Sequence, residues 1–303
     1  MKENTFSLKD KIIASLKILG VLWVIGFVAA IFLYGSQPEL ASGNVAVIPL
    51  HGVITSTTEG GFSTDYISAD QIIRSLDKAD KNPNIRAILL DINSPGGSPV
   101  GTDEISQKLK SINKTKIAVI REVGASGAYW VATSTDYIFA NRMSVTGSIG
   151  VIGSYLEFSG LLNRYNVTYE RFVSGELKDM GSPFKAPSEQ DRIAFQSLID
   201  KMREIFVQEV SANRHLPLSK VDRLATGEVF LGTEAQKLGL VDAIGTKQDA
   251  LDYIGARLNI SADPVDFREK KSLADLLAEF SSMLNPKIGN FINSAAPNPI
   301  SLR

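Results

Sequence analysis

From residue 44 onward the chain alternates short apolar strands with helices, and this alternation restricts its fold more than any other feature. Residues 86–92 (RAILLDI) form an almost unbroken apolar run, which is typical of a strand buried on both faces of a parallel sheet. We expect further strands at 45–50, 117–121, 137–140 and 167–173, and helices at 68–79, 102–112, 188–214 and 247–258, with another helix opening from the turn at 124–130. The sequence therefore predicts an α/β fold class with right-handed crossovers.

The composition excludes several classes of function. The chain has 303 residues, of which 44% are hydrophobic, so it can fill a core and is not a disordered protein. Its formal net charge is −1, which provides no basic field for a nucleic acid, and we expect no nucleic-acid partner. It has no cysteine and only two histidines, so thiolate metal sites, cysteine nucleophiles and a three-histidine metal site are all absent from one chain. We expect neither a metal nor a cofactor.

Residues 18–34 predict a membrane anchor. These 17 positions are uncharged and mostly apolar, and as a helix they would span roughly 26 Å, close to the ~30 Å thickness of the hydrocarbon core. Lys9, Lys11 and Lys17 precede the segment, which favours a cytoplasmic N-terminus and export of the chain that follows. Two alternatives are a cleaved signal peptide, with small residues at 41–43, and a buried core helix. We favour the uncleaved anchor over a signal peptide because the apolar segment is longer than a usual signal core and the small residues lie several positions beyond it. A buried core helix is disfavoured because the run is apolar all round and lies at the very start of the chain.

Two short loops follow strands in positions suited to chemistry. In the NSPGG loop at 93–97, glycines allow backbone N–H groups to approach a ligand closely, as an oxyanion hole requires. In the GASGA loop at 124–128, Ser126 would expose its hydroxyl at the start of a helix, beside the amide of Gly127. Each loop also has a plain structural interpretation: the first as a tight turn without a ligand, and the second as a helix capped by Ser126.

A nucleophilic serine needs a base. His51 lies at a strand end and His215 at the end of the long helix, and no histidine occurs between Ser126 and residue 214. A lysine can replace histidine if burial lowers its pKa from about 10.4 to roughly 7–8. Lys178 lies in a loop at 174–184 that contains glycine and proline, where a lysine is otherwise an ordinary solvated side chain.

Five ordered motifs suggest a choice between these interpretations. They are NSPGG at 93–97, ASG at 125–127, TGSIGVIG at 146–153, GxxKxxxSPF at 175–184 and TGxxFxGxxAxxLGLVDxxG at 226–245. Together they resemble the signal peptide peptidase A family of membrane-anchored serine proteases, whose fold is related to those of Clp protease and crotonase. The resemblance implies a core of repeated β-β-α units wound into a superhelix, with an N-terminal transmembrane helix.

The resemblance also implies roles for individual residues. Ser126 would be the nucleophile, Lys178 the general base, Gly97 and Gly127 the donors of the oxyanion hole, and Ser148 the group that orients the lysine amine. The chain is similar to the short form of the family, which implies a homo-oligomer whose serine and lysine come from adjacent subunits. The implied substrates are remnant signal peptides and similar hydrophobic fragments, and the implied location is the exported face of a bacterial-type inner membrane, in contact with lipid.

The resemblance and the composition together suggest a division of the chain. We expect a cytoplasmic N-terminus at 1–17, the anchor at 18–34, a linker at 35–44, the Ser-Lys peptidase domain at 45–258 and an amphipathic tail at 259–303. Two other functions stay open. A crotonase-like acyl-thioester enzyme would use the same oxyanion cradle but has little use for an anchor, and a non-catalytic membrane scaffold would not need a serine and lysine pair.

Overall fold

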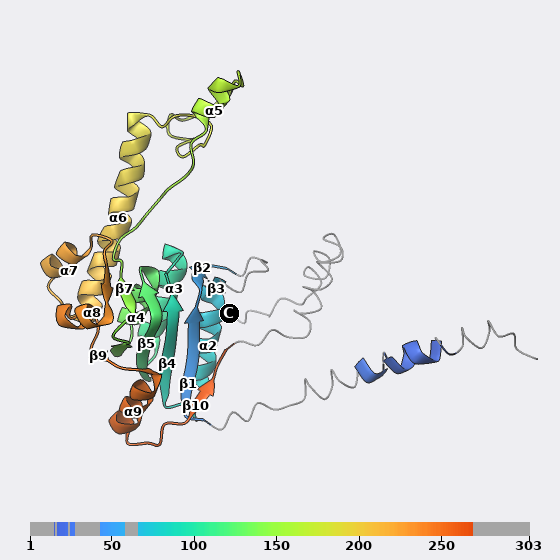
Figure 1. Ribbon diagram of the computed structural model, residues 1–303, viewed down its shortest axis with the longest axis vertical. Helices are drawn as coiled ribbons and strands as arrows, with labels where there is room; N and C mark the ends of the chain where they lie inside the picture. The colour runs from blue at the N-terminus through green and yellow to red at the C-terminus, as the bar shows by residue number, and fades with distance from the viewer. Residues whose placement is uncertain (1–14, 16, 24, 28–42, 58–65, 269–303) are drawn as a thin grey trace, which may run out of the picture. The chain divides into compact units, whose positions relative to one another are not determined.

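The computed structural model describes residues 15, 17–23, 25–27, 43–57 and 66–268 (Figure 1). The described residues from 43 to 268 belong to one compact unit. Residues 17–23 and 25–27 are helical, but the rest of the expected anchor, the linker up to residue 42 and the tail beyond residue 268 lie outside the described residues. No helix in the described part of the chain is long and apolar enough to cross a bilayer.

A mostly parallel sheet forms the centre of the compact unit. Its main path runs β10 (Pro264–Asp266), β1 (Val45–His51), β4 (Ala87–Ser94), β5 (Thr115–Ala125), β6 (Tyr137–Ala140) and β9 (Ala243–Ile244), with every neighbouring pair parallel. The end of β5 also pairs in parallel with β7 (Val145–Gly147), which pairs antiparallel with β8 (Val229–Leu231). A separate pair joins β2 (Val53–Thr55) to β3 (Tyr66–Ser68). The structure thus confirms an α/β fold with a parallel sheet.

Helices cover both faces of this sheet, as the apolar run at 86–92 predicted. Ile88, Leu90 and Ile92 of β4 face a core that includes residues of the helices α2 (Ala69–Lys81), α3 (Pro99–Ser111), α4 (Gly127–Thr133) and α6 (Glu189–Arg214). The alternating residues Ala87 and Leu89 face a second core, formed with α9 (Lys247–Leu258). The remaining helices are α5 (Ser159–Arg164), α7 (Leu218–Leu224) and α8 (Gly232–Leu238).

Most expected elements are present, with two changes that concern the site. Strand β5 continues to Ala125, beyond the expected end at 121, because its last residues pair with β4 on one side and β7 on the other. The strand expected at 167–173 is wrong: these residues contain no strand. Val167 and Phe172 are 51% and 93% exposed, so the apolar pattern there does not face this subunit's core. A strand needs hydrogen-bonding neighbours as well as local propensity.

Residues 151–205, which we call the arm, stand apart from the sheet. Figure 1 shows α5 and the N-terminal end of α6 extending away from the strands, whereas the C-terminal half of α6 packs on the core through Phe206, Val207 and Val210. The arm leaves large apolar side chains uncovered; Ile152 is 87% exposed. Exposed apolar side chains that gather on one segment often mark a site of contact with another protein.

Candidate active site

Three parallel strands end side by side at the proposed site. In the register of the sheet, Ser94 of β4 lies opposite Gly124 of β5, and Ala125 of β5 lies opposite Gly147 of β7. The residues that follow these strands are therefore neighbours, which brings the NSPGG loop, Ser126 and Ser148 to one edge. Ligands of open α/β sheets bind at this carboxyl edge.

Ser126 occupies a strained turn between β5 and α4. Its φ of 53° and ψ of −126° are uncommon for a residue with a side chain and cost on the order of 1–3 kcal/mol. The turn is held by the Ser126 N–H, which donates to the Gly147 carbonyl at 2.9 Å, and by the Ser126 carbonyl, which accepts from Trp130 N at 3.0 Å. Ser126 is partly exposed, whereas Ala125 and Gly127 are buried. A strained strand-to-helix turn of this kind can present a serine hydroxyl at the edge of a sheet.

The glycine turn of the NSPGG loop packs directly against Ser126. Gly96 has a φ of +99°, and a Cβ added there would lie 2.7 Å from the Gly127 nitrogen and 2.9 Å from the Ser126 Cβ. Next to it, a Cβ on Gly97 would lie 2.1 Å from the carbonyl oxygen of Ile54 in β2. Gly127 is the first residue of α4, so its N–H has no acceptor within that helix. The two predicted oxyanion donors thus lie on touching turns.

Ser148 follows β7 just as Ser126 follows β5. It too has a positive φ, 50°, and its N–H donates to the Glu228 carbonyl at 2.7 Å. Adjacent strands are about 4.8 Å apart, so a group placed one residue beyond the pair of Ala125 and Gly147 is within reach of Ser126. Ser148 is partly exposed, as is Ser126.

Lys178 is not brought to this edge within the chain. It is exposed and lies in the arm, in a turn where its N–H donates to the Gly175 carbonyl at 3.0 Å. Figure 1 shows that the segment between β7 and α6 runs away from the ends of β4 and β5. The structure therefore brings together Ser126, Gly97, Gly127 and Ser148, and holds the predicted base on a separate surface.

The two histidines have other surroundings. His51 ends β1, and its Nε2 lies 3.7 Å from the Asp91 carboxylate, which also pairs with Arg121 at 3.4 Å and Lys247 at 3.1 Å. Burial raises the pKa of Asp91, but hydrogen bonds with His51 and Lys247 and the charges of Lys247 and Arg121 lower it overall to about 2. His215 is the left-handed C-cap of α6. The positions of both agree with the view that neither is paired with Ser126.

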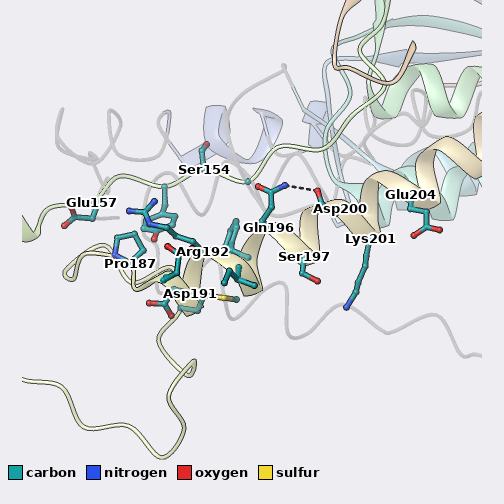
Figure 2. A pocket seen from close by; sticks show the side chains of 16 residues that line it. Ser154, Glu157, Pro187, Asp191, Arg192, Gln196, Ser197, Asp200, Lys201 and Glu204 are labelled. Atoms are coloured by element: carbon teal, nitrogen blue, oxygen red, sulfur yellow. Dashed lines mark hydrogen bonds between the residues drawn. The ribbon is translucent and has the colours of Figure 1, made fainter. Parts of the chain in front are cut away.

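A cavity of about 1000 Å³ lies in the arm rather than at the serine (Figure 2). It is lined by residues of 153–157 and of the first half of α6, and none of the five predicted site residues lines it. In Figure 2 its walls carry Glu157 on one side and Asp191, Arg192 and Asp200 on the helix. It is a feature of the arm surface and is separate from the chemistry at Ser126.

Sequence reasoning missed one residue beside the site. Thr102 of α3 is fully buried, and its Oγ1 would lie 2.3 Å from a Cβ placed on Gly127. That hydroxyl has no hydrogen-bond partner in the described part of the chain. Thr102 therefore restricts position 127 to glycine, and no motif spacing in the sequence indicates this contact.

Comparison with known proteins finds one matching family and several similar proteins. Residues 108–261, just over half of the chain, match the family described as "Peptidase family S49". "Putative protease MJ0651" of Methanocaldococcus jannaschii is 33% identical over 67% of the chain and 66% of its own length. "Putative signal peptide peptidase SppA" of Enterococcus faecium is 36% identical over 71% of the chain and 64% of its own length. "Protease 4" of Haemophilus influenzae is 31% identical over 80% of the chain but only 39% of its own length. The chain thus spans less than two thirds of each of these relatives.

Proposed function

Because this chain belongs to peptidase family S49, we propose that it is a serine endopeptidase in which Ser126 attacks the peptide carbonyl and Lys178 of a neighbouring copy acts as the base. Family membership confirms the resemblance inferred from the five motifs and the enzyme class, that of the serine peptidases. The observation that carries the residue assignment is the strained turn at Ser126, packed against the Gly96–Gly97 turn.

The chemistry begins with proton transfer from the Ser126 hydroxyl to a neutral Lys178 amine as the oxygen attacks. The amides of Gly97 and Gly127 donate hydrogen bonds to the oxyanion of the tetrahedral intermediate, a contribution that typically changes the rate by 10²–10³-fold for each donor. Lys178 then gives its proton to the leaving amine, which leaves an acyl group on Ser126. In the second half, Lys178 takes a proton from water, the hydroxide attacks the ester, and the proton returns to Ser126.

The shared site follows from where Lys178 lies. An exposed lysine is protonated at neutral pH and cannot accept a proton, whereas burial lowers its pKa into the useful range. The arm around Lys178 exposes apolar side chains, among them Phe172 at 93%, which a second copy would cover. Docking would then desolvate the amine at the same time as it delivers it to Ser126, with Ser148 orienting it. A single subunit would be inactive.

The remaining parts of the proposal concern context. Remnant signal peptides and similar hydrophobic fragments are the proposed substrates, by analogy with the name of the Enterococcus faecium relative. The apolar segment at 18–34 is the proposed single-pass anchor, placing the peptidase domain at the exported face of a bacterial-type inner membrane, next to lipid. The superhelical Clp/crotonase-like arrangement of the core also stays a prediction.

The test is cleavage of a synthetic signal peptide by the full chain purified in detergent. Ser126→Ala and Lys178→Ala should each abolish cleavage while the far-UV spectrum and thermal unfolding stay as in the wild type. Lys237→Ala, which removes an exposed lysine on α8, should cleave normally and serves as the matched control. Wild-type cleavage by either folded site variant would refute the proposal.

A further inference from the structure

Thr102 carries a buried hydroxyl that makes no hydrogen bond. The side chain belongs to α3 and is fully buried, and its Oγ1 has no hydrogen-bond partner among the described residues. An unpaired buried hydroxyl is unfavourable, and a valine of nearly the same shape would avoid that loss. A threonine at this position therefore has a use other than hydrogen bonding, and the residue that its hydroxyl faces indicates what this use is.

The Thr102 side chain fills the space in which a side chain of residue 127 would stand. A Cβ placed on Gly127 would collide with Thr102 Oγ1 and would lie 3.4 Å from both Cβ and Cγ2 of Thr102. The Gly96 turn touches the same residue, because a Cβ on Gly96 would lie 2.7 Å from the Gly127 nitrogen. Gly127 is thus confined by two groups, Gly96 beside its amide nitrogen and Thr102 beside its Cα.

Both groups belong to one short segment that its own hydrogen bonds hold. Helix α3 begins directly after the NSPGG loop, with Ser98 as its N-cap. Ser98 N donates to the Ile54 carbonyl of β2 at 2.8 Å, and the Ser98 carbonyl accepts from Thr102 N at 3.0 Å. Ser98 Oγ also accepts from Gly101 N at 3.2 Å. The stretch from Gly97 to Thr102 is therefore tied to β2 and moves as a unit.

The two amides beside this segment are available to a ligand. Within the described residues, neither the Gly97 N–H nor the Gly127 N–H donates to a backbone acceptor. A pair of donors stabilises an oxyanion only if each lies about 2.7–3.1 Å from the place that the oxygen takes. The separation of the two amides therefore matters to a fraction of an ångström, and Thr102 belongs to the segment that sets it.

We propose that Thr102 is a positioning residue for peptide hydrolysis: its side chain sets the distance between the Gly97 and Gly127 amides. An oxygen at Oγ1, which is smaller than a methyl group, lets Gly127 lie close to α3. This inference rests on the proposed function. It differs from a purely structural role because valine suits the buried surroundings better than threonine does but fits the catalytic geometry worse.

The test compares Thr102→Val with Thr102→Ser in the full chain purified in detergent, by kcat and KM for cleavage of a synthetic signal peptide. Thr102→Val puts a methyl group where Oγ1 lies, which should displace Gly127 and lower kcat about 10-fold. KM should change by less than about twofold, because the oxyanion forms only after the substrate is bound. Thr102→Ser keeps the oxygen and should keep kcat within about twofold of the wild type.

Thermal unfolding of the same variants should follow the opposite order. Thr102→Ser loses a buried methyl group, which lowers Tm. Thr102→Val removes the unpaired hydroxyl, so its Tm should be no lower than that of Thr102→Ser. The slower enzyme is then the one that is at least as stable, an order that loss of stability alone does not produce.

A peptide aldehyde gives an independent measure of the oxyanion site. The Ser126 oxygen forms a bond to the aldehyde carbon, the C=O π pair moves onto the carbonyl oxygen, and the hydroxyl proton passes to Lys178. Because the two amides bind the resulting oxyanion, the inhibition constant should rise about 10-fold in Thr102→Val and stay near the wild-type value in Thr102→Ser.

Thr133→Val is the matched control. Thr133 is the last residue of α4, is 2% exposed, and its Oγ1 donates to the Trp130 carbonyl at 2.6 Å. The same exchange there should lower Tm through the lost hydrogen bond and leave kcat and the inhibition constant unchanged. Wild-type kcat in Thr102→Val, or losses of kcat that follow the order of the Tm values, would overturn the inference. Cleavage that persists in Ser126→Ala would instead refute the proposed function itself.

Discussion

Gly96→Ala tests the contact between the two turns of the site. The new Cβ would lie 2.7 Å from the Gly127 nitrogen and 2.9 Å from both the Ala125 oxygen and the Ser126 Cβ, so the Gly127 amide must shift by about half an ångström. A displacement of this order at a catalytic group costs up to about 10²-fold in rate, and a misplaced oxyanion donor costs a similar factor. The φ of +99° adds about 1–2 kcal/mol of backbone strain.

The assay is kcat/KM for peptide cleavage, measured beside thermal unfolding. Gly239→Ala is the control, because Gly239 has a similar φ of +81° but its nearest neighbours are side-chain atoms at 3.4 Å or more. Both variants carry the strain of a positive φ, and Gly96→Ala should lose more stability because its Cβ also meets backbone atoms. Only Gly96→Ala should lose about 10²-fold in kcat/KM. Equal activity in the two variants would refute the claim that Gly96 sets the position of the oxyanion donor.

Three further predictions concern stability, measured by urea unfolding. Leu90→Ala, at a fully buried position of β4, should lower the free energy of unfolding by about 3 kcal/mol. Val100→Ala, at a position that is 60% exposed, should lower it by under about 0.5 kcal/mol. Equal losses in the two variants would contradict a sheet that is buried on both faces. Asp91→Asn should lower the free energy of unfolding by about 2 kcal/mol at pH 7. The pKa of Asp91 in the folded protein, about 2, lies below its ordinary value, so the difference in stability between wild type and variant should persist above pH 4–5 and shrink as the pH falls towards 2. Arg214→Ala should lower the free energy of unfolding by about 3 kcal/mol, because it leaves Asp242 without the guanidinium that lies 2.7 Å away. A loss under about 1 kcal/mol would show that this ion pair does not hold α6 in place.

Local patterns in the sequence were sufficient to predict the strands and helices that form the core. The apolar run at 86–92 predicted β4, and the helix expected at 188–214 is α6, whose start is capped by a contact between Ser188 and Asp191. The extension of β5 to Ala125 could not be predicted this way, because it depends on pairing with β7, where Ala125 lies opposite Gly147, 22 residues further along the chain. That extension is what places Ser126 at the edge of the sheet.

The residues of the site could be predicted from the order of the motifs, but the way they come together could not. The NSPGG and ASG motifs led to Gly97, Ser126 and Gly127, which the structure brings to one edge, whereas the contact of Thr102 with Gly127 depends on helix packing that no short pattern encodes. The residues at 167–173 have a strand-like pattern without a strand partner in this subunit. In the proposed function the arm docks on a second copy, so patterns within one chain could not reveal its role.

The central claim is that the nucleophile and the base meet from different copies of the chain. Mixing full-length Ser126→Ala with full-length Lys178→Ala tests it most directly, because each variant alone lacks one group and a mixed assembly contains interfaces that have both. The account predicts that each pure variant is inactive and that cleavage of a synthetic signal peptide returns on mixing and subunit exchange. Mixtures that assemble together yet stay inactive at every ratio would contradict it.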